Sequence, residues 1–177
     1  INGDFESGLT SWVTTAGVGT TSTAISGSQS AYINSSTQSL SALDSFFGLT
    51  SGTFLSTLDC SDEPCIQGSG LYQSISHQAG DVLSFDWLTT LENSSYYVDW
   101  VGFVAEDMLI QLGNGTNTAN NTLFNTEYTF LTTGTSLFGF VVGDGGDSCC
   151  GSSMTIDNVA LATAVPEPGS VALFGLG

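Results

Sequence analysis

The chain has no cationic side chain, other than one histidine, with which to pair its acids. Its 177 residues include no lysine and no arginine, against 17 Asp and Glu residues, so the formal net charge at pH 7 is -17. Only His77 and the N-terminal amine could form an ion pair with a carboxylate. Every other carboxylate has to face water, bind a metal ion, or accept hydrogen bonds from backbone N–H groups and hydroxyls. The fold must therefore surround each buried acid with such donors.

The missing cations also exclude whole classes of function. A chain without lysine and arginine offers no basic patch to nucleic acid or anionic lipid, no clamp for phosphate groups and no lysine for a Schiff base. We therefore expect no nucleic-acid partner.

Composition favours strands over helices. Hydrophobic residues make up 41% of the chain and aromatic residues 11%, which is enough for a packed core. The 25 Ser, 22 Thr and 22 Gly residues are typical of strands with hydroxyl-bearing outer faces joined by glycine-rich turns. Alternating and apolar runs between turn signals predict an all-β fold, an antiparallel β-sandwich. The expected strands span 12–15, 22–26, 30–34, 71–76, 81–89, 96–105, 108–112, 126–132, 136–142 and 154–162.

Two of these segments predict how strands are buried. Residues 81–89 place Leu83, Phe85 and Trp87 on one face, as in a strand that is buried on one side. The run 96–105 is apolar on both faces and predicts a central or covered strand.

One short helix is expected near 39–48. Ser39 is a suitable N-cap and Gly48 a suitable end, and the apolar residues between them fall at helical spacing: Leu40, Leu43, Phe46 and Phe47.

Four cysteines indicate an oxidising compartment. Cys60 and Cys65 enclose a short loop, whereas Cys149 and Cys150 are adjacent. Three pairings are possible: two local bridges, Cys60–Cys65 and Cys149–Cys150, or either of two sets that join the loops. Buried free thiols are the alternative. A zinc site is disfavoured because Cys149 and Cys150 lack the usual two-residue spacer.

Residues 164–177 are expected to lie outside a domain formed by residues 1–163. They contain Pro166-Glu167-Pro168 and an apolar run far shorter than the roughly 20 residues that span a bilayer. Residues 165–170, followed by a run of Gly, Leu and Ala, resemble a PEP-CTERM sorting signal. This resemblance implies processing by an exosortase and a secreted or cell-surface location in a Gram-negative-type bacterium. Membrane contact would be transient, through an uncleaved C-terminal segment.

A second resemblance spans most of the domain. Asn-Gly-Asp-Phe-Glu at 2–6, followed by Trp12, resembles the opening strand of carbohydrate-binding-module-like jelly rolls, and 155–161 resembles their closing strand. Segments 70–75 and 79–87 fit the middle strands. The resemblance implies a galactose-binding-like jelly roll in which the first and last strands are adjacent. It also implies a structural calcium ion at that junction, held by Asp4 or Glu6 and by Asp157.

The sequence shows no catalytic constellation. His77 is the only imidazole, and we expect it at the surface, at a strand end. No nucleophile motif such as Gly-x-Ser-x-Gly lies near it. With 17 acids some pair approaches by chance, so paired carboxylates would carry little information. We therefore expect a protein that is not an enzyme.

Sugars could be bound by this chain or covalently attached to it. An exposed aromatic platform could bind them, and the candidates are Trp12, Trp87 and Trp100, although Trp87 and Trp100 lie in apolar runs typical of a core. Sugars could also be attached at Asn-x-Ser/Thr sequons, which occur at Asn34, Asn93, Asn114 and Asn120.

The function predicted from these observations is that of an exported structural protein. It would be a self-associating subunit of an extracellular filament, sheath or biofilm matrix. A C-terminal strand would add to the neighbouring subunit through Val171, Leu173, Phe174 and Leu176 and so build a homopolymer. The alternative is a cell-surface carbohydrate-binding module that holds exopolysaccharide. The direction in which the aromatic side chains face distinguishes the two.

Overall fold

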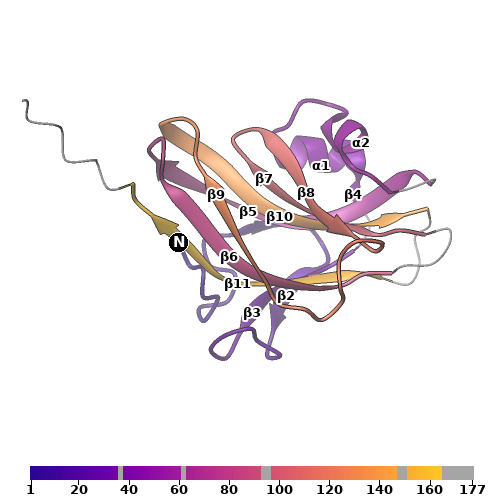
Figure 1. Ribbon diagram of the computed structural model, residues 1–177, viewed down its shortest axis with the longest axis horizontal. Helices are drawn as coiled ribbons and strands as arrows, with labels where there is room; N and C mark the ends of the chain where they lie inside the picture. Colours follow the sequence, from indigo (N-terminus) through magenta and orange to yellow (C-terminus); the bar gives the residue numbers. More distant parts are fainter. Residues whose placement is uncertain (36–37, 61–62, 93–96, 147–150, 165–177) are drawn as a thin grey trace, which may run out of the picture.

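Two antiparallel sheets pack face to face in the computed structural model, which describes residues 1–35, 38–60, 63–92, 97–146 and 151–164 (Figure 1). The strands are β1 (Val13–Thr14), β2 (Val18–Thr21), β3 (Ser30–Asn34), β4 (Gln38–Ser39), β5 (Cys65–His77), β6 (Val82–Thr90), β7 (Trp100–Ala105), β8 (Met108–Asn114), β9 (Phe124–Thr129), β10 (Gly134–Gly145) and β11 (Ser153–Ala162). Sheet A has the order β1-β5-β10-β7-β8, with β4 also paired to β5, and sheet B the order β2-β3-β11-β6-β9. This confirms the predicted all-β antiparallel sandwich.

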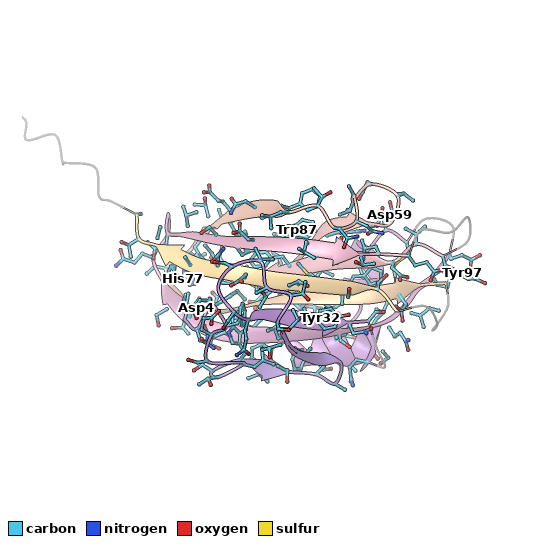
Figure 2. All side chains as sticks on the ribbon, turned by 90° about the horizontal axis from the view of Figure 1, so that it is seen from below. Asp4, Tyr32, Asp59, His77, Trp87 and Tyr97 are labelled. Carbon is cyan, nitrogen blue, oxygen red and sulfur yellow. A yellow bond between two sulfur atoms is a disulfide. The ribbon has the colours of Figure 1, made fainter. Side chains whose placement is uncertain are left out.

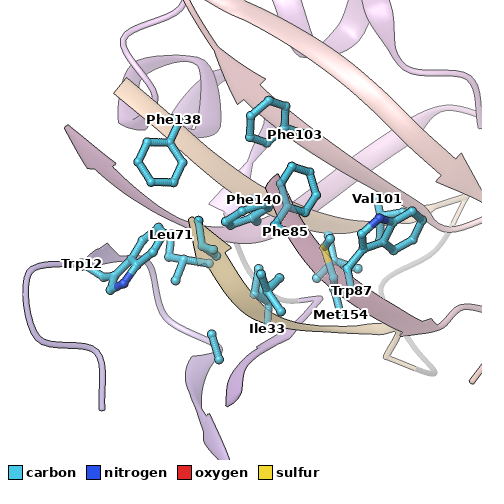
Figure 3. Close-up of a cluster of buried hydrophobic side chains, with 14 of the residues drawn as sticks. Trp12, Ile33, Leu71, Phe85, Trp87, Val101, Phe103, Phe138, Phe140 and Met154 are labelled. Atoms are coloured by element: carbon cyan, nitrogen blue, oxygen red, sulfur yellow. The ribbon is translucent and has the colours of Figure 1, made fainter. Parts of the chain in front are cut away.

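The main core lies between the sheets and is rich in aromatic rings (Figure 3). Phe85 of β6 packs on Phe103 of β7 and Phe140 of β10, with ring centroids 5.0 and 4.8 Å apart. Leu83, Phe85 and Trp87 are all buried here, while the residues between them are half-exposed. The predicted one-sided burial of this strand is therefore confirmed.

Two helices cover the outer face of sheet A (Figure 1). Helix α1 (Leu40–Phe46) begins at Ser39, whose hydroxyl accepts a hydrogen bond from the Ala42 N–H at 3.3 Å, as predicted. Helix α2 (Thr53–Thr57) was not predicted, so the expectation of one helix is wrong. Five residues are too few to show helical periodicity. Instead the buried Asp44 carboxylate holds the start of α2 by accepting from the N–H groups of Gly52 and Phe54.

A second core lies between these helices and sheet A. Trp100 of β7 is fully buried there, with its ring centroid 5.9 Å from that of Phe54 in α2. Every residue of β7 is buried, which confirms that its apolar run forms a strand covered on both faces.

The strand predicted at 22–26 is wrong, because the strand is β2 at Val18–Thr21. Five N–H groups in the segment 22–30 bond to side-chain oxygens instead of to a neighbouring strand. β5 (Cys65–His77) is also longer than the predicted 71–76 and includes Gly68 and Gly70.

Carboxylates are surrounded by N–H and hydroxyl donors, as the absence of lysine and arginine requires. Glu106, in the two-residue turn between β7 and β8, accepts hydrogen bonds from Leu131 N–H, Thr132 and the Tyr128 hydroxyl. Partial burial raises the pKa of Glu106, but these hydrogen bonds outweigh it and lower the pKa to about 2. Asp81 accepts from the N–H groups of Gln78 and Ala164, which lowers its pKa as well.

Cys60 and Cys65 form a disulfide with Cα atoms 5.5 Å apart, which confirms the local pairing for these two residues and excludes bridges from them to the other loop. Cys149 and Cys150 lie outside the described residues. Within the described segments, no helix is long and apolar enough to cross a membrane.

Candidate functional site

Sheet B presents its outer face without a covering helix in the described residues (Figure 2). Tyr32 of β3, the strand next to the edge strand β2, faces outward because Ala31 and Ile33, on either side of it, point into the core. Its cross-strand partners are Gly19 of β2 and Thr155 of β11, and Thr155 pairs in turn with Leu88 of β6. The space above Gly19 is open, so the β2 residue directly opposite Tyr32 contributes no side chain.

A hollow of about 360 Å³ lies at this position. We call it the Tyr32 hollow, and every residue that lines it is uncharged: Thr21, Thr23, Ala24, Tyr32, Leu88, Thr90, Asn121, Ser153 and Thr155. The lining combines apolar surface from Tyr32 and Leu88 with hydroxyl and amide groups. Such a surface suits a neutral, hydroxyl-rich molecule that has one apolar face.

Asn121 is held in place by the loop between β8 and β9. The Asn120 side chain bonds to both backbone groups of Leu91, at 2.7 and 2.9 Å, and the Asn121 N–H donates to the Thr89 carbonyl at 2.8 Å. Asn121 itself has a φ of 56°, a conformation that asparagine tolerates better than most residues. These contacts fix the backbone of Asn121, whose side-chain Oδ1 accepts from the Thr90 hydroxyl at 3.4 Å beside the Tyr32 hollow.

None of the three tryptophans forms an exposed platform. Trp12, Trp87 and Trp100 are 7%, 4% and 0% exposed, so their interpretation as sugar-binding platforms is wrong, and the core interpretation of Trp87 and Trp100 is confirmed. Sequence reasoning missed Tyr32, although the alternation Ala-Tyr-Ile in the predicted strand 30–34 is a signal that it faces outward.

His77 is buried, so its expected surface position is wrong. Its ring stacks on Phe130 at a centroid distance of 3.9 Å. The ring nitrogens are both engaged, Nδ1 with the Thr132 carbonyl at 3.0 Å and Nε2 with the Ser136 hydroxyl at 2.8 Å. We interpret His77 as a structural residue that ties β5 to β10 and to the segment before it.

The acids proposed for calcium hold a turn by hydrogen bonds. Glu6 accepts from Ser28 and from the Gln29 N–H, and these bonds, led by the Ser28 hydroxyl, lower its pKa. Asp157 accepts from Ser26 N–H, the Ser30 hydroxyl and Asn158 N–H. Both acids therefore hold the segment 26–30. Asp4 lies in a neighbouring hollow beside Asn158.

The hydrogen bonds of these carboxylates bear directly on the predicted calcium ion. Each carboxylate oxygen of Glu6 and Asp157 already accepts an N–H or O–H group, and the described residues contain no group of three or more His, Cys, Asp or Glu side chains placed to hold a metal. Calcium binding by Asp4, Glu6 and Asp157 stays a prediction. Thermal unfolding in excess calcium and in EDTA checks it: a melting temperature several degrees higher in calcium would support the ion, and equal values would contradict it.

A second group of acids is buried at the far end of the sandwich. Asp99 and Asp144 are 1% and 2% exposed, and Asp99 accepts from Gly145 N–H and from the Ser152 hydroxyl. Burial, helped by the nearby charges of Asp144 and Glu92, outweighs these hydrogen bonds and raises the pKa of Asp99 to about 6. One oxygen each of Asp144 and Glu92 is buried without a hydrogen bond within the described residues.

The candidate glycosylation sites differ in access. Asn114 is 2% exposed and its Nδ2 donates to the Asp59 carbonyl, so the folded domain does not present it as an acceptor. Asn34 and Asn120 are exposed and stay predictions. Asn93 lies outside the described residues.

The fold is similar to that of two solved carbohydrate-binding modules. A structure of TmCBM61 in complex with β-1,4-galactotriose has a TM-score of 0.52 at 18% identity, over 92% of this chain and 96% of that one. Family 16 carbohydrate-binding module-2 has a TM-score of 0.50 at 14% identity, over 92% and 97%. No family model matches the sequence, and no curated protein matches it. The predicted jelly-roll architecture is thereby confirmed.

Proposed function

We propose that this domain is a carbohydrate-binding module that holds a neutral glycan in the Tyr32 hollow of sheet B. The observation that carries the proposal is the hollow itself: an aromatic side chain, half-exposed on the open sheet face and surrounded by hydroxyl and amide groups, with no charged residue in the lining. An apolar sugar face can pack on the Tyr32 ring while the sugar hydroxyls bond to the surrounding groups.

The comparisons support this alternative better than the filament prediction. The two solved modules share the fold of this chain, and one of them was crystallised with a galactotriose. They are binding modules and not catalysts, which agrees with the expectation that the chain is not an enzyme. Because both likenesses lie under 25% identity, the choice of ligand here rests on the Tyr32 hollow.

Charge restricts the ligand to neutral glycans. The protein carries a net charge of -17 and no lysine or arginine to bind a carboxylate or sulfate group. A polyuronate would be repelled over about a Debye length and would find no ionic partner. An exopolysaccharide of neutral sugars is therefore the partner we propose.

Export to the cell surface fits the same function. The Cys60–Cys65 disulfide is typical of proteins that mature in an oxidising compartment. The PEP-CTERM-like residues, which lie outside the described part of the chain, point to the same destination. Surface display by a Gram-negative-type bacterium would place the module where polysaccharide is found.

The test is binding to defined glycans. We expect retardation in affinity gels that contain a neutral polysaccharide, with β-1,4-galactan in the panel, and none with a polyuronate. Tyr32→Ala should weaken binding at least tenfold, about 1.4 kcal/mol, because it removes the apolar platform. Tyr32→Phe should keep most of the affinity. Leu131→Ala, at an exposed position elsewhere, is the control.

Two results would contradict the proposal. One is the absence of retardation by every neutral polysaccharide. The other is equal retardation of the wild type and Tyr32→Ala, which would place the glycan elsewhere.

A further inference from the structure

A layer of buried polar side chains closes one end of the core between the two sheets. Trp87, Val101 and Met154 lie at this end of the core (Figure 3). One step farther along each strand, which is two residues on the same face, the side chain is polar. We call these residues the polar layer, and each of them is at most 8% exposed: Ser35 after β3, Thr89 of β6, Asp99 before β7, Asp144 of β10 and Ser152 before β11.

The two acids of the polar layer lie opposite each other. β7 and β10 are antiparallel with Trp100 opposite Gly143, so the same register places Asp99 opposite Asp144. The segments stay together beyond this point, because the Gly145 N–H donates to Asp99 Oδ1 at 2.9 Å. Side chains paired in this way have Cβ atoms about 4.5–5.5 Å apart, and like charges at that spacing destabilise the fold.

The polar layer also contains oxygen atoms that lack a partner. In the described part of the chain, Asp144 Oδ1 and Thr89 Oγ1 are buried and form no hydrogen bond, although their residues are only 2% and 0% exposed. The other Asp144 oxygen accepts from the Gln67 amide at 2.8 Å. Unpaired buried oxygens are costly, so they indicate that the layer holds a partner which is not a side chain of this protein.

A third acid lies beside the layer. The Glu92 N–H donates to the Ser152 hydroxyl at 2.8 Å, and that hydroxyl donates in turn to Asp99. Glu92 Oε2 is likewise buried without a hydrogen bond, whereas the residue as a whole is half-buried. Glu92 therefore adds negative charge at the point where the layer reaches the solvent.

No cationic side chain can neutralise these acids. The chain has neither lysine nor arginine, and His77 lies at the opposite end of β5 from Gln67. A proton is one remaining partner. Burial, with the charges of Asp144 and Glu92, raises the pKa of Asp99 to about 6, so a proton serves only in acidic solution. At neutral pH the partner has to be another cation.

We propose that the polar layer binds a calcium ion between the carboxylates of Asp99 and Asp144. Calcium takes oxygen ligands at about 2.3–2.6 Å, so two oxygens on one ion lie at most about 5 Å apart, a span that paired aspartates can meet. The described residues contain no third acid placed with these two, so neutral oxygens such as the Thr89 hydroxyl and water would complete the shell. Two carboxylates suit a dissociation constant of about 10⁻⁴–10⁻³ M, as in extracellular modules.

This site is separate from the two described above. Asp157, of the calcium ion predicted from the sequence, lies farther along β11 than Ser152 and bonds to the segment 26–30. No residue of the polar layer lines the Tyr32 hollow. The inference therefore does not depend on the proposed glycan binding.

Sensitised terbium luminescence tests the site in the full chain. Terbium replaces calcium in oxygen sites, and the Trp100 indole N–H donates to the Asp144 carbonyl at 3.4 Å, so excited Trp100 lies close enough to sensitise an ion there. At pH 7.5 we expect emission that calcium displaces. Asp144→Asn should weaken terbium and calcium binding at least tenfold, since it removes a charged ligand while its amide oxygen still accepts from Gln67. Asp99→Asn should have the same effect.

Two control variants accompany the titration. Asp107→Asn makes the same change of charge at an exposed position and should bind as the wild type does. Asp4→Asn removes an acid of the other predicted site, where Trp12 could also sensitise terbium because its indole donates to the Asn2 carbonyl at 2.9 Å. In this variant we expect the emission that depends on Asp144 to remain. Calorimetric titration with calcium measures the same affinities without relying on a tryptophan.

Three results would overturn the proposal. One is the absence of both sensitised emission and a heat of calcium binding at pH 7.5. Another is equal affinity in the wild type, Asp99→Asn and Asp144→Asn. The third is loss of binding with Asp4→Asn alone, which would assign the ion to the other end of the sandwich. Glycan retardation that depends on Tyr32 is measured independently, so the two proposals fail separately.

Discussion

Replacing Trp100 with alanine is expected to lower the unfolding free energy by about 3–5 kcal/mol, the usual range for a large aromatic residue in a core. Trp100 is fully buried between sheet A and helix α2, where it contacts Phe54. Its ring lies so close to Gly143 of β10 that a Cβ atom there would collide with it. Gly143 has no side chain that could move into the space left by the ring.

Urea denaturation of the variant measures this loss. Leu55→Ala is the matched control, since Leu55 lies on α2 but is 66% exposed and should cost no more than about 0.5 kcal/mol. A loss below about 1 kcal/mol for Trp100→Ala would mean that the helix layer adds little to the stability of the sandwich.

Asp99→Asn is expected to change how stability depends on pH. Burial raises the pKa of Asp99 to about 6 in the folded protein, against about 3.9 in an unfolded chain. Between these values the folded protein keeps the proton that the unfolded chain has lost. The unfolding free energy therefore falls as the pH rises from about 4 to about 6, by about 3 kcal/mol for a shift of two units, and stays lower above pH 6.

In the Asp99→Asn variant, the unfolding free energy should not fall between pH 4 and pH 6 in this way. Its amide oxygen can accept from the Gly145 N–H and its amide nitrogen can donate to the Ser152 hydroxyl, so the contacts of Asp99 are preserved. At pH 7 we expect the variant to be more stable than the wild type, with the two converging near pH 4. Urea denaturation from pH 4 to 8 checks this. Asp107→Asn, at an exposed position, controls for the change in net charge. Parallel pH profiles for Asp99→Asn and the wild type would contradict the expectation.

The pKa of Glu106 is shifted in the opposite direction to that of Asp99. Its pKa is lowered to about 2 by hydrogen bonds, so its contribution to stability is present above about pH 4.5 and is lost as the pH falls toward 2. Together with Asp99, this places the expected maximum of stability in mildly acidic solution, below the neutral pH at which the charge of -17 is fully developed.

The sequence was sufficient for the sandwich because its strands follow simple patterns. Alternation in β6 and the apolar run of β7 gave both the strands and their burial. Prediction from the sequence failed where the local structure depends on residues that are distant in the chain. The segment 22–30 resembles a strand, but its N–H groups bond to residues such as Asp157, more than 120 positions away. Asp99 lies inside the predicted strand 96–105, but its burial could not be predicted, because acids are rarely buried without a partner and its partners Gly145 and Ser152 are distant in the sequence.

The candidate site was predicted only in part for the same reason. An aromatic ring remains the proposed sugar-binding group, but the tryptophans predicted for this role were wrong, because all three are buried in the two cores. Tyr32 gave a clear signal of orientation through its neighbours Ala31 and Ile33. The hollow around Tyr32 could not be predicted, because it depends on Gly19 and Asn121. The sheet register places Gly19 beside Tyr32, and the 115–123 loop brings Asn121 to it.

Strand β11 links the Tyr32 hollow to the start of the chain. Ser153 and Thr155 line the hollow, and farther along the same strand the Val159 N–H donates to the Gly3 carbonyl. Several copies of the proposed site, displayed side by side on one surface, would raise the avidity for a polysaccharide by about 10²–10⁴ without any new contact. A shallow, uncharged hollow with modest affinity for one sugar chain would then be sufficient to hold that surface to its matrix.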